Sequence, residues 1–182
     1  MFRAFIAVEL GDGFQPDKLL DELKSFGRDL KTVEPDNMHA TLKFLGDTDE
    51  NSVDDIRKAM EESVLGTPPI DVEFHGVGVF PNMGYIRVVW AGMNGAEPLV
   101  EIAKRLESSL SKLGFKKERP FSPHVTLARV KFLKDKKRMQ ELLRAHEDDD
   151  LGTARIERIV LKKSRLAPAG PTYSDVCEAA LK

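Results

Sequence analysis

The sequence predicts an α+β protein made of two similar lobes within one domain. Three observations support this fold class: β-rich runs alternate with amphipathic helical patterns, the order helix, strand, helix occurs twice, and both of those strands contain His-x-Thr-Leu. The two motifs occupy residues 39–42 and 124–127. Recurrence of one unit is typical of a fold with internal symmetry. We therefore expect residues 1–182 to form a single domain of two intertwined lobes, each contributing one motif strand.

The first half of the chain alternates strand and helix patterns. The expected elements are a strand at residues 2–10, a helix at 17–30, a strand with the first motif at 37–46 and a helix at 51–64. Apolar residues recur at helical spacing in both helical segments: Leu19, Leu23, Phe26 and Leu30 in the first, and Val53, Ile56, Met60 and Val64 in the second. Pro16 and Asp17 favour a helix start, and Gly46 closes the motif strand.

The second half repeats this order after an antiparallel pair. The expected elements are strands at residues 70–80 and 85–92, a helix at 97–114, a strand with the second motif at 122–130, a helix from 134 that runs into the acidic run at 147–150, and strands at 154–167 and 172–181. The turn "PNMG" at 81–84 suits a hairpin. The whole order suggests two similar α+β lobes in one domain.

Composition excludes several classes of protein. The net charge of −2 and the pI near 6.1 argue against a global positive field that would hold a long nucleic-acid duplex. Cys177 is the only cysteine, which excludes an internal disulfide framework and fits a reducing compartment. No segment approaches the roughly twenty apolar residues of a membrane span. We expect a cytoplasmic monomer without membrane attachment.

Each motif places one histidine and one threonine on the same face of a strand. Side chains alternate faces, so His39 and Thr41 point the same way, as do His124 and Thr126. For one motif alone, a half-buried polar pair without function is the better interpretation. With seven threonines in 182 residues, however, two of four histidines would each precede a threonine by two positions in only about one sequence in a hundred. The duplication therefore favours a functional site.

Two facing imidazoles can supply one base and one acid. The ordinary pKa of imidazole, about 6.5, allows it to take or give a proton near neutral pH. A threonine beside each histidine adds a short hydroxyl donor. A reaction that needs a base, an acid and two donors, in a chain without a Gly-rich phosphate loop or a cysteine cluster, is displacement at phosphorus, and a phosphodiester fits.

These residues also resemble a known family. "HATL" at 39–42 and "HVTL" at 124–127 resemble the paired HxTx motifs of the 2H phosphoesterase superfamily. Within it, "FRAFIAVEL", "HATLKFLGD", "GVGVFP" and "LKKSRLAPAGPTYSDV" are similar to the RNA 2',3'-cyclic phosphodiesterases, historically called 2'-5' RNA ligases. The likeness spans nearly the whole chain. It implies a bilobal, pseudo-twofold fold in which two antiparallel sheets form a central cleft and the helices pack outside.

The resemblance also implies an activity and a role for each motif residue. The expected reaction is hydrolysis of an RNA 2',3'-cyclic phosphate end to a 2'-phosphomonoester, without metal or cofactor, with tRNA halves among the candidate RNAs. His39 would donate a proton to the leaving 3' oxygen, and His124 would activate water. Thr41 and Thr126 would bind phosphate oxygens. By microscopic reversibility, the same pair could join a 2' hydroxyl to a cyclic phosphate end without ATP.

Three further residues are weaker candidates for the site. Arg129 ends the second motif and could meet a phosphate, although strict alternation places it opposite His124 unless the strand bends or bulges. Lys43 shares the face of His39 and could neutralise phosphate, but an exposed strand-end lysine is the commoner finding. Phe80, and less strongly Phe44, could stack on a base, with core packing as the alternative.

The remaining polar clusters are expected to be solvated. The basic run "KKERP" at 116–120 could attract an RNA end, but an exposed loop explains it equally well. We expect His75 to face solvent and His146 to end a helix, where the helix dipole favours a cation. The acidic run "EDDD" at 147–150 is expected to be a solvated loop, and we assign no metal site.

Two alternative functions stay open at this stage. The protein could be an enzyme of the same class that acts on a different phosphodiester, such as a small cyclic nucleotide, an ADP-ribose cyclic phosphate or a 2'-5' linkage. It could instead be an RNA-end binding module without turnover. The two intact histidines argue against the second alternative, because recognition alone requires neither an acid nor a base.

Overall fold

The computed structural model describes residues 1–182 as two antiparallel sheets. The first sheet has the order β3-β1-β8-β9, formed by β1 (Phe2–Glu9), β3 (His39–Thr48), β8 (Arg158–Ala167) and β9 (Gly170–Ala180). The second has the order β2-β6-β5-β4-β7, formed by β2 (Leu30–Thr32), β4 (Ile70–Asn82), β5 (Tyr85–Asn94), β6 (His124–Val130) and β7 (Asp150–Ile156). Every strand pairing is antiparallel. The predicted α+β class is confirmed.

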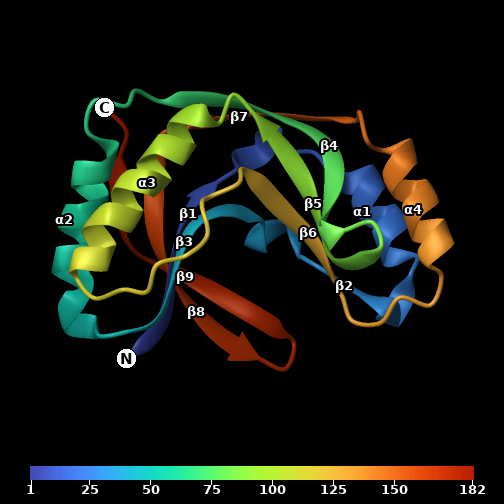
Figure 1. The fold of residues 1–182 in the computed structure, drawn as a ribbon, viewed down its shortest axis with the longest axis horizontal. Helices are drawn as coiled ribbons and strands as arrows, with labels where there is room; N and C mark the ends of the chain where they lie inside the picture. The colour runs from blue at the N-terminus through green and yellow to red at the C-terminus, as the bar shows by residue number, and fades with distance from the viewer.

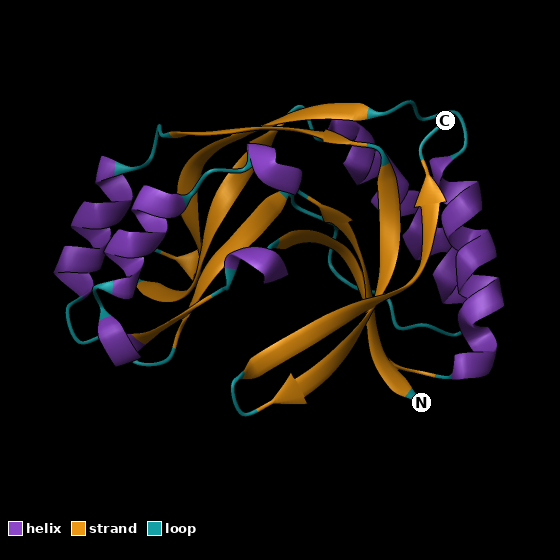
Figure 2. Cartoon of the chain, turned by 180° about the vertical axis from the view of Figure 1, so that it is seen from behind, coloured by secondary structure: helices purple, strands orange, loops and turns teal.

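Helices cover the two outer ends of the molecule. Figure 1 shows α2 (Val53–Val64) and α3 (Glu97–Lys112) beside the first sheet, and α1 (Asp17–Lys24) and α4 (Lys136–Ala145) beyond the second. The view from behind in Figure 2 shows the same two helical layers with the strands between them. Four 3-10 turns complete the chain: η1 (Gly11–Gly13), η2 (Gly27–Asp29), η3 (Pro35–Asn37) and η4 (Glu50–Ser52). None of the helices is long and apolar enough to cross a membrane.

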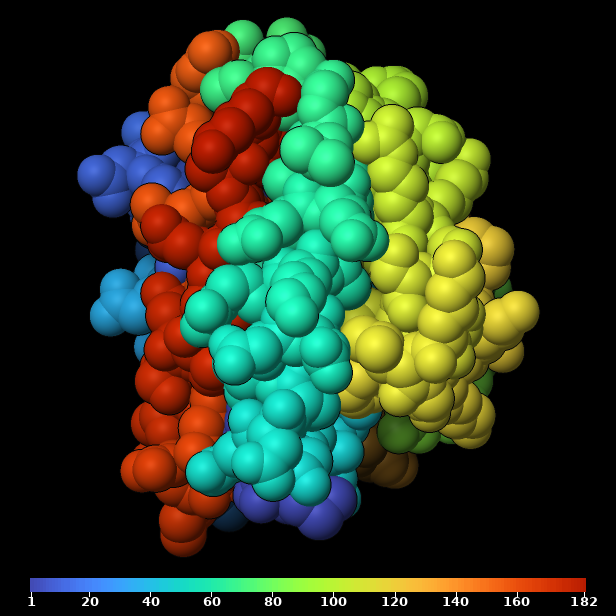
Figure 3. All heavy atoms as spheres, turned by 90° about the vertical axis from the view of Figure 1, so that its left-hand side faces the viewer, coloured from blue at the N-terminus to red at the C-terminus, as the bar shows by residue number.

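The two lobes exchange segments of chain. In sequence, α3 lies between two strands of the second sheet, but it packs beside α2 and contacts β3 of the first. On the end of the molecule seen in Figure 3, α2 runs between α3 and β9. One connected hydrophobic cluster of 41 buried residues includes side chains from both sheets and all four helices. The elements that position the two motifs therefore share one core.

The sheets are related by a pseudo-twofold arrangement of strands. Counting outward from the motif strand, β3-β1-β8-β9 corresponds to β6-β5-β4-β7. The second sheet has one additional strand, β2, which pairs with the outer side of β6. This asymmetry leaves β3 at the edge of its sheet and gives β6 a neighbour on both sides.

The expected helix at residues 17–30 is too long. It ends at Lys24, and Leu30 instead begins β2. Gly27 has a φ of +59°, a left-handed conformation that glycine adopts without steric cost and that a right-handed helix cannot contain. Leu23, Phe26 and Leu30 are all buried. Their spacing therefore reflects burial along a segment that is helix at its start and strand at its end, and it does not indicate one continuous helix.

The expected strand at residues 154–167 is two strands in different sheets. Ile156 ends β7, which pairs with β4, and Arg158 begins β8, which pairs with β1. Both parts are β-rich, so composition does not indicate the change of sheet at Glu157. The acidic run is also only partly loop, because α4 ends at Ala145 and Asp150 begins β7.

Candidate active site

The two motif strands, one from each sheet, come close to each other where the sheets meet. Figure 1 shows β3 and β6 in the centre of the molecule, and the backbones of the two strands lie near each other. His39 is the first residue of β3 and His124 the first residue of β6. Both imidazoles are half-buried, as are Thr41 and Thr126. The fold thus brings together two segments that are 85 positions apart in the sequence.

Both histidines are held by the same hydrogen bond. The Nδ1 atom of His39 lies 2.7 Å from the carbonyl oxygen of Asn37, and that of His124 lies 2.6 Å from the carbonyl oxygen of Ser122. A carbonyl oxygen can only accept, so Nδ1 carries the proton and donates in each case. The Nε2 atom of each ring is therefore an acceptor when the ring is neutral and a donor when it is protonated. Each ring is oriented for proton transfer through Nε2.

A β-bulge follows each motif threonine. In β3, Thr41 and Lys43 pair with consecutive residues of β1, so Leu42 is the extra residue. In β6, Leu127 is extra in the same way opposite β5. A bulge shifts the alternation of faces by one position. Two consecutive residues after each threonine are consequently buried, and the next exposed side chain is Phe44 in one strand and Arg129 in the other.

The bulge at Leu127 places Arg129 on the same face as His124. Strict alternation would have placed Arg129 on the opposite face. The prediction that Arg129 could meet a phosphate therefore required a bend or a bulge in the strand, and β6 contains a bulge. The positive charge of Arg129 lowers the pKa of His39 and the pKa of His124. The guanidinium therefore lies within electrostatic reach of both imidazoles, and its own side chain is exposed to solvent.

The bulge at Leu42 moves Lys43 away from the face of His39. The expectation that Lys43 shares that face and could neutralise phosphate is therefore wrong, and so is the alternative of an exposed lysine. Lys43 is buried, with 2% of its surface exposed, and its Nζ donates to the carbonyl oxygen of Lys116 at 2.6 Å and pairs with Glu107 at 2.9 Å. Its ammonium is thus used to anchor the loop before the second motif to β3. The backbone nitrogen of Phe44 strengthens this anchor by donating to Glu118.

Aromatic rings enclose each histidine. His39 stacks on Phe5, with ring centroids 4.8 Å apart, and meets the ring of Tyr173 edge-on at 5.3 Å. His124 meets Phe80 edge-on at 5.0 Å and lies 6.2 Å from the ring of Trp90. Phe80 is therefore at the site, but its ring packs against a catalytic candidate and against Trp90. Sequence reasoning did not assign Phe5, Tyr173 or Trp90 to the site, because each comes from a different strand and lies in neither His-x-Thr motif.

Burial and positive charge favour the neutral form of both rings. Burial lowers the pKa of His39, as do the charges of Lys162 and Arg129, against a smaller opposite effect of the hydrogen bond to Asn37. Burial and the charge of Arg129 likewise lower the pKa of His124. Both values fall below the ordinary 6.5. In the free protein, both imidazoles are predominantly neutral at pH 7.

The other two histidines lie away from this site. His75 is exposed on β4, as predicted. His146 is the C-cap of α4, so it closes the helix as predicted, but it is 3% exposed, with Nδ1 hydrogen-bonded to Asp149 and Nε2 to Glu22 at 3.0 Å. Asp149 is therefore hydrogen-bonded to a buried histidine. The prediction that residues 147–150 form a solvated loop is wrong for this residue.

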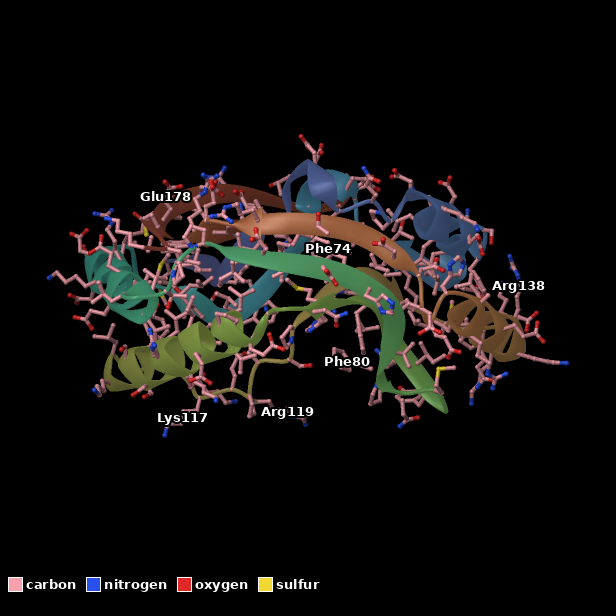
Figure 4. All side chains as sticks on the ribbon, turned by 90° about the horizontal axis from the view of Figure 1, so that it is seen from above. Phe74, Phe80, Lys117, Arg119, Arg138 and Glu178 are labelled. Carbon is pink, nitrogen blue, oxygen red and sulfur yellow. The ribbon has the colours of Figure 1, made fainter.

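The basic loop at residues 116–120 is exposed throughout. Figure 4 shows the side chains of Lys117 and Arg119 projecting outward from the chain on the side of α3. The segment is thus an exposed loop, and Lys43 holds its first residue through the carbonyl oxygen of Lys116.

The fold, the paired motifs and the chain as a whole agree with one family. Residues 13–166 match the model of the 2'-5' RNA ligase superfamily, and the chain belongs to that superfamily. Among curated relatives, it is 38% identical over 176 residues to the RNA 2',3'-cyclic phosphodiesterase of Methanothermobacter thermautotrophicus, which covers 96% of each chain. It is also 38% identical over 178 residues to the RNA 2',3'-cyclic phosphodiesterase of Methanocaldococcus jannaschii, covering 97% of this chain and 99% of that protein.

Solved structures share the arrangement of the two sheets. TT0787 of Thermus thermophilus superposes with a TM-score of 0.76 at 28% identity, over 98% of this chain and 97% of that one. The LigT protein of E. coli, solved in complex with 3'-AMP, superposes with a TM-score of 0.73 at 23% identity, over 99% of this chain and 98% of that one. The bilobal fold expected from the motifs is therefore confirmed.

Proposed function

We propose that this protein hydrolyses the 2',3'-cyclic phosphate at the end of an RNA to a 2'-phosphomonoester, with His39 as the acid and His124 as the base. The observation that carries the proposal is the identical setting of the two imidazoles, each with Nδ1–H bonded to a carbonyl two residues earlier. Relatives that cover 96% or more of the chain are RNA 2',3'-cyclic phosphodiesterases, which supports the choice of substrate.

The reaction requires one proton to be removed and one to be supplied. Nε2 of neutral His124 takes a proton from a water molecule as its oxygen bonds to phosphorus. The bond between phosphorus and the 3' oxygen breaks on the opposite side, and Nε2–H of protonated His39 gives its proton to that oxygen. The product keeps the phosphate on the 2' oxygen, and a proton exchange with solvent restores both histidines.

The remaining polar groups stabilise the charge on the phosphate. The hydroxyls of Thr41 and Thr126 are proposed to donate to its two non-bridging oxygens, one from each strand. The guanidinium of Arg129 adds a permanent positive charge on the same face. Donors fixed on strands need little rearrangement as negative charge increases in the transition state, which is where such donors have their largest effect.

The bound phosphate is also expected to change the protonation state of His39. His39 must be protonated to act as an acid, whereas burial and neighbouring cations lower its pKa in the free protein. A phosphodiester anion beside the ring favours the imidazolium and raises that pKa. Substrate binding thus prepares the acid.

Ligation is also proposed to be available to the same residues. Nε2 of His124 would remove the proton of a 5' hydroxyl as its oxygen bonds to phosphorus, the bond between phosphorus and the 3' oxygen would break, and His39 would protonate that oxygen. Formation of the 2'-5' linkage uses the energy of the strained ring, so no nucleotide cofactor is consumed, and cleavage of that linkage would exchange the roles of the two histidines.

Substitution of each histidine tests the proposal. His39→Ala and His124→Ala should each reduce hydrolysis of an oligonucleotide with a 2',3'-cyclic phosphate end by about a hundred- to ten-thousand-fold. His75→Ala removes an exposed histidine and is the matched control. Circular dichroism should show that all three variants are folded. EDTA should not change the rate.

The product distinguishes the proposal from its alternatives. Phosphorus NMR of the product should show a 2'-phosphomonoester. Full activity in either motif variant would refute the mechanism. Tight binding of cyclic-phosphate RNA by the wild-type protein without turnover would indicate an RNA-end binding module. Turnover of other small cyclic phosphodiesters, but of no RNA end, would assign the same chemistry to a different substrate.

A further inference from the structure

Three basic side chains form a row at the end of the second sheet. Lys31 on β2 is directly opposite Arg129 on β6, and directly opposite residues of an antiparallel pair have their side chains on the same face. Lys131 follows one residue after β6 ends. All three side chains are exposed. The additional strand β2, which has no counterpart in the first sheet, is what brings Lys31 to this position.

None of the three forms an ion pair. Carboxylates neutralise many basic residues of the chain, but no carboxylate oxygen lies within 4.0 Å of Lys31, Arg129 or Lys131. Lys134, a few residues further on, is different, because its ammonium lies 3.8 Å from Asp29. Three adjacent unpaired cations repel one another, and a polyanion would relieve that repulsion.

The row begins at the candidate active site and reaches the opposite lobe. Arg129 acts electrostatically on both catalytic histidines. A side-chain carbon placed on Gly170 would lie 3.7 Å from Nζ of Lys31, so this ammonium lies against the tip of the β8–β9 hairpin of the first sheet. Asn37 donates to the carbonyl oxygen of Pro171 at the same place. The basic row therefore lines one end of the space between the two motif strands.

The segment that continues the row is held in a fixed conformation. The carbonyl oxygen of Asp29 accepts from the backbone nitrogens of Lys131 and Phe132, at 2.8 and 3.3 Å, and the side-chain Oδ2 of Asp29 accepts from the backbone nitrogen of Lys134 at 3.0 Å. The Phe132 ring is nevertheless 69% exposed. A large apolar ring on an anchored loop beside unpaired cations is the combination with which proteins bind single-stranded nucleic acid.

An acidic pocket beside His39 would repel a phosphate chain. This pocket of about 580 Å³ is lined by His39 and by four carboxylates, Glu9, Asp12, Asp17 and Asp36. Its one lysine, Lys162, is held by Glu9 and Asp175 at 2.8 and 2.6 Å. The charge around His39 is thus asymmetric, and phosphates are favoured only toward the basic row.

We propose that Lys31, Lys131 and Phe132 bind the single-stranded RNA that precedes the cyclic phosphate end. The two lysines contact phosphodiester groups on the 5' side of the terminal nucleotide, and the ring of Phe132 stacks on a base. This inference rests on the proposed function and refines its substrate class. The protein would prefer an oligonucleotide with a cyclic end to a nucleoside 2',3'-cyclic phosphate, which lacks those phosphates.

The test compares these two substrates at two salt concentrations. Each phosphate contact of a single strand contributes a slope of about −0.7 to the dependence of log affinity on log salt. Two additional contacts correspond to about a sevenfold greater loss of kcat/KM for the oligonucleotide than for the nucleoside cyclic phosphate between 50 and 200 mM salt. The double variant Lys31→Gln/Lys131→Gln should lose this additional dependence and hydrolyse the nucleoside cyclic phosphate at the wild-type rate.

Matched variants separate the surface from general effects. Lys58→Gln removes an exposed lysine on α2, and Leu65→Ala removes an exposed apolar side chain just after that helix. Both should behave as the wild type with both substrates. Phe132→Ala should lower kcat/KM only for the oligonucleotide, and Phe132→Trp should retain it, since an indole ring also stacks.

The outcomes distinguish this inference from the proposed function. Equal salt dependence for the two substrates, or an equal loss in the lysine variants and in Lys58→Gln, would overturn the RNA surface and leave the hydrolase intact. An unchanged kcat/KM of Phe132→Ala for the oligonucleotide would exclude the Phe132 ring from the RNA-binding surface. Failure of the wild-type protein to hydrolyse either substrate would instead overturn the proposed function.

Discussion

The charge of Arg129 acts on both members of the proposed acid–base pair, so this one residue contributes to the pH dependence of the reaction in addition to the burial of the two rings. The profile of kcat/KM reports the free protein and is centred on the mean of the two histidine pKa values. Both are lowered below 6.5, so the wild-type optimum is expected below pH 6.5. The profile of kcat should lie at higher pH, because bound phosphate raises the pKa of the acid.

Replacing Arg129 separates its charge from its contact with phosphate. Arg129→Gln removes the cation, so the pKa values of His39 and His124 should rise and the kcat/KM optimum should move to higher pH. Arg129→Lys keeps the charge and should keep the wild-type optimum, even if it loses rate through poorer geometry. The measurement is kcat/KM of a nucleoside 2',3'-cyclic phosphate from pH 4.5 to 8.5. An unshifted optimum in Arg129→Gln would contradict the electrostatic coupling.

At the level of residues, the sequence predicted the histidine and threonine of each motif as candidates for the site and little else about it. The His-x-Thr spacing is local, so strand alternation sufficed to bring each histidine and threonine together. The faces on which Lys43 and Arg129 lie depend on the bulges at Leu42 and Leu127, which the alternation of side chains cannot indicate. The aromatic neighbours Phe5, Tyr173 and Trp90 come from distant strands, and only the tertiary structure brings them to the imidazoles.

At the level of elements, the structure contains a buried ionic contact between α1 and α4 that does not involve the active site. His146 at the end of α4 bonds to Glu22 of α1 and to Asp149 before β7. Burial alone would lower the pKa of His146, but hydrogen bonds to both carboxylates and their charges outweigh it and raise that pKa above 6.5. The contact is therefore strongest when the ring is protonated.

The raised pKa of His146 predicts how stability depends on pH. A group whose pKa is higher in the folded protein contributes its full stabilisation below the unfolded value of about 6.5 and loses it as pH rises through the folded value. His146→Ala should lower the free energy of unfolding by about 2 kcal/mol at pH 5.5. The difference from wild type should decrease as pH rises above 6.5. Urea unfolding from pH 5.5 to 9 measures it.

His75→Ala is the control for this experiment, because that ring is exposed and forms no hydrogen bond within the chain. It should leave the free energy of unfolding within about 0.5 kcal/mol of wild type at every pH. A constant difference between His146→Ala and wild type across the pH range would show that the ring contributes by packing alone. Hydrolysis by His146→Ala at pH 5.5 should be retained wherever the protein is folded.

Most helices and strands were predictable because their apolar patterns have one consistent period. The limits of α2, α3 and the motif strands lie within a few residues of the prediction. The errors fall where burial continued through a change of structure, as at Gly27, or where one β-rich run served two sheets, as at Glu157. In both places the determining interactions are with distant strands, which a local pattern does not contain.

At the level of the whole molecule, the exchange of segments between lobes is the reason to propose a single folding unit. The second sheet includes β2, which lies in sequence between β1 and β3 of the first, and α3 leaves the second sheet to pack on the first. The first sheet combines β1 and β3 from the beginning of the chain with β8 and β9 from its end, so a cut at any one point between β1 and β8 would divide the strands of this sheet between two fragments. The shared cluster of 41 buried residues links the stability of the two sheets.

A conservative change in one sheet should therefore destabilise the other to the same extent. Ile159 on β8 is fully buried in the first sheet, and Trp90, the only tryptophan, lies on β5 in the second. Ile159→Val should cost about 1 kcal/mol. Urea unfolding followed by Trp90 fluorescence should show that whole loss, with a midpoint equal to the one from far-UV circular dichroism. An unchanged fluorescence midpoint beside a shifted dichroism midpoint would mean that the lobes unfold separately. Coincident shifts would instead indicate that the two histidine-bearing strands, and the space between them, form and disappear together.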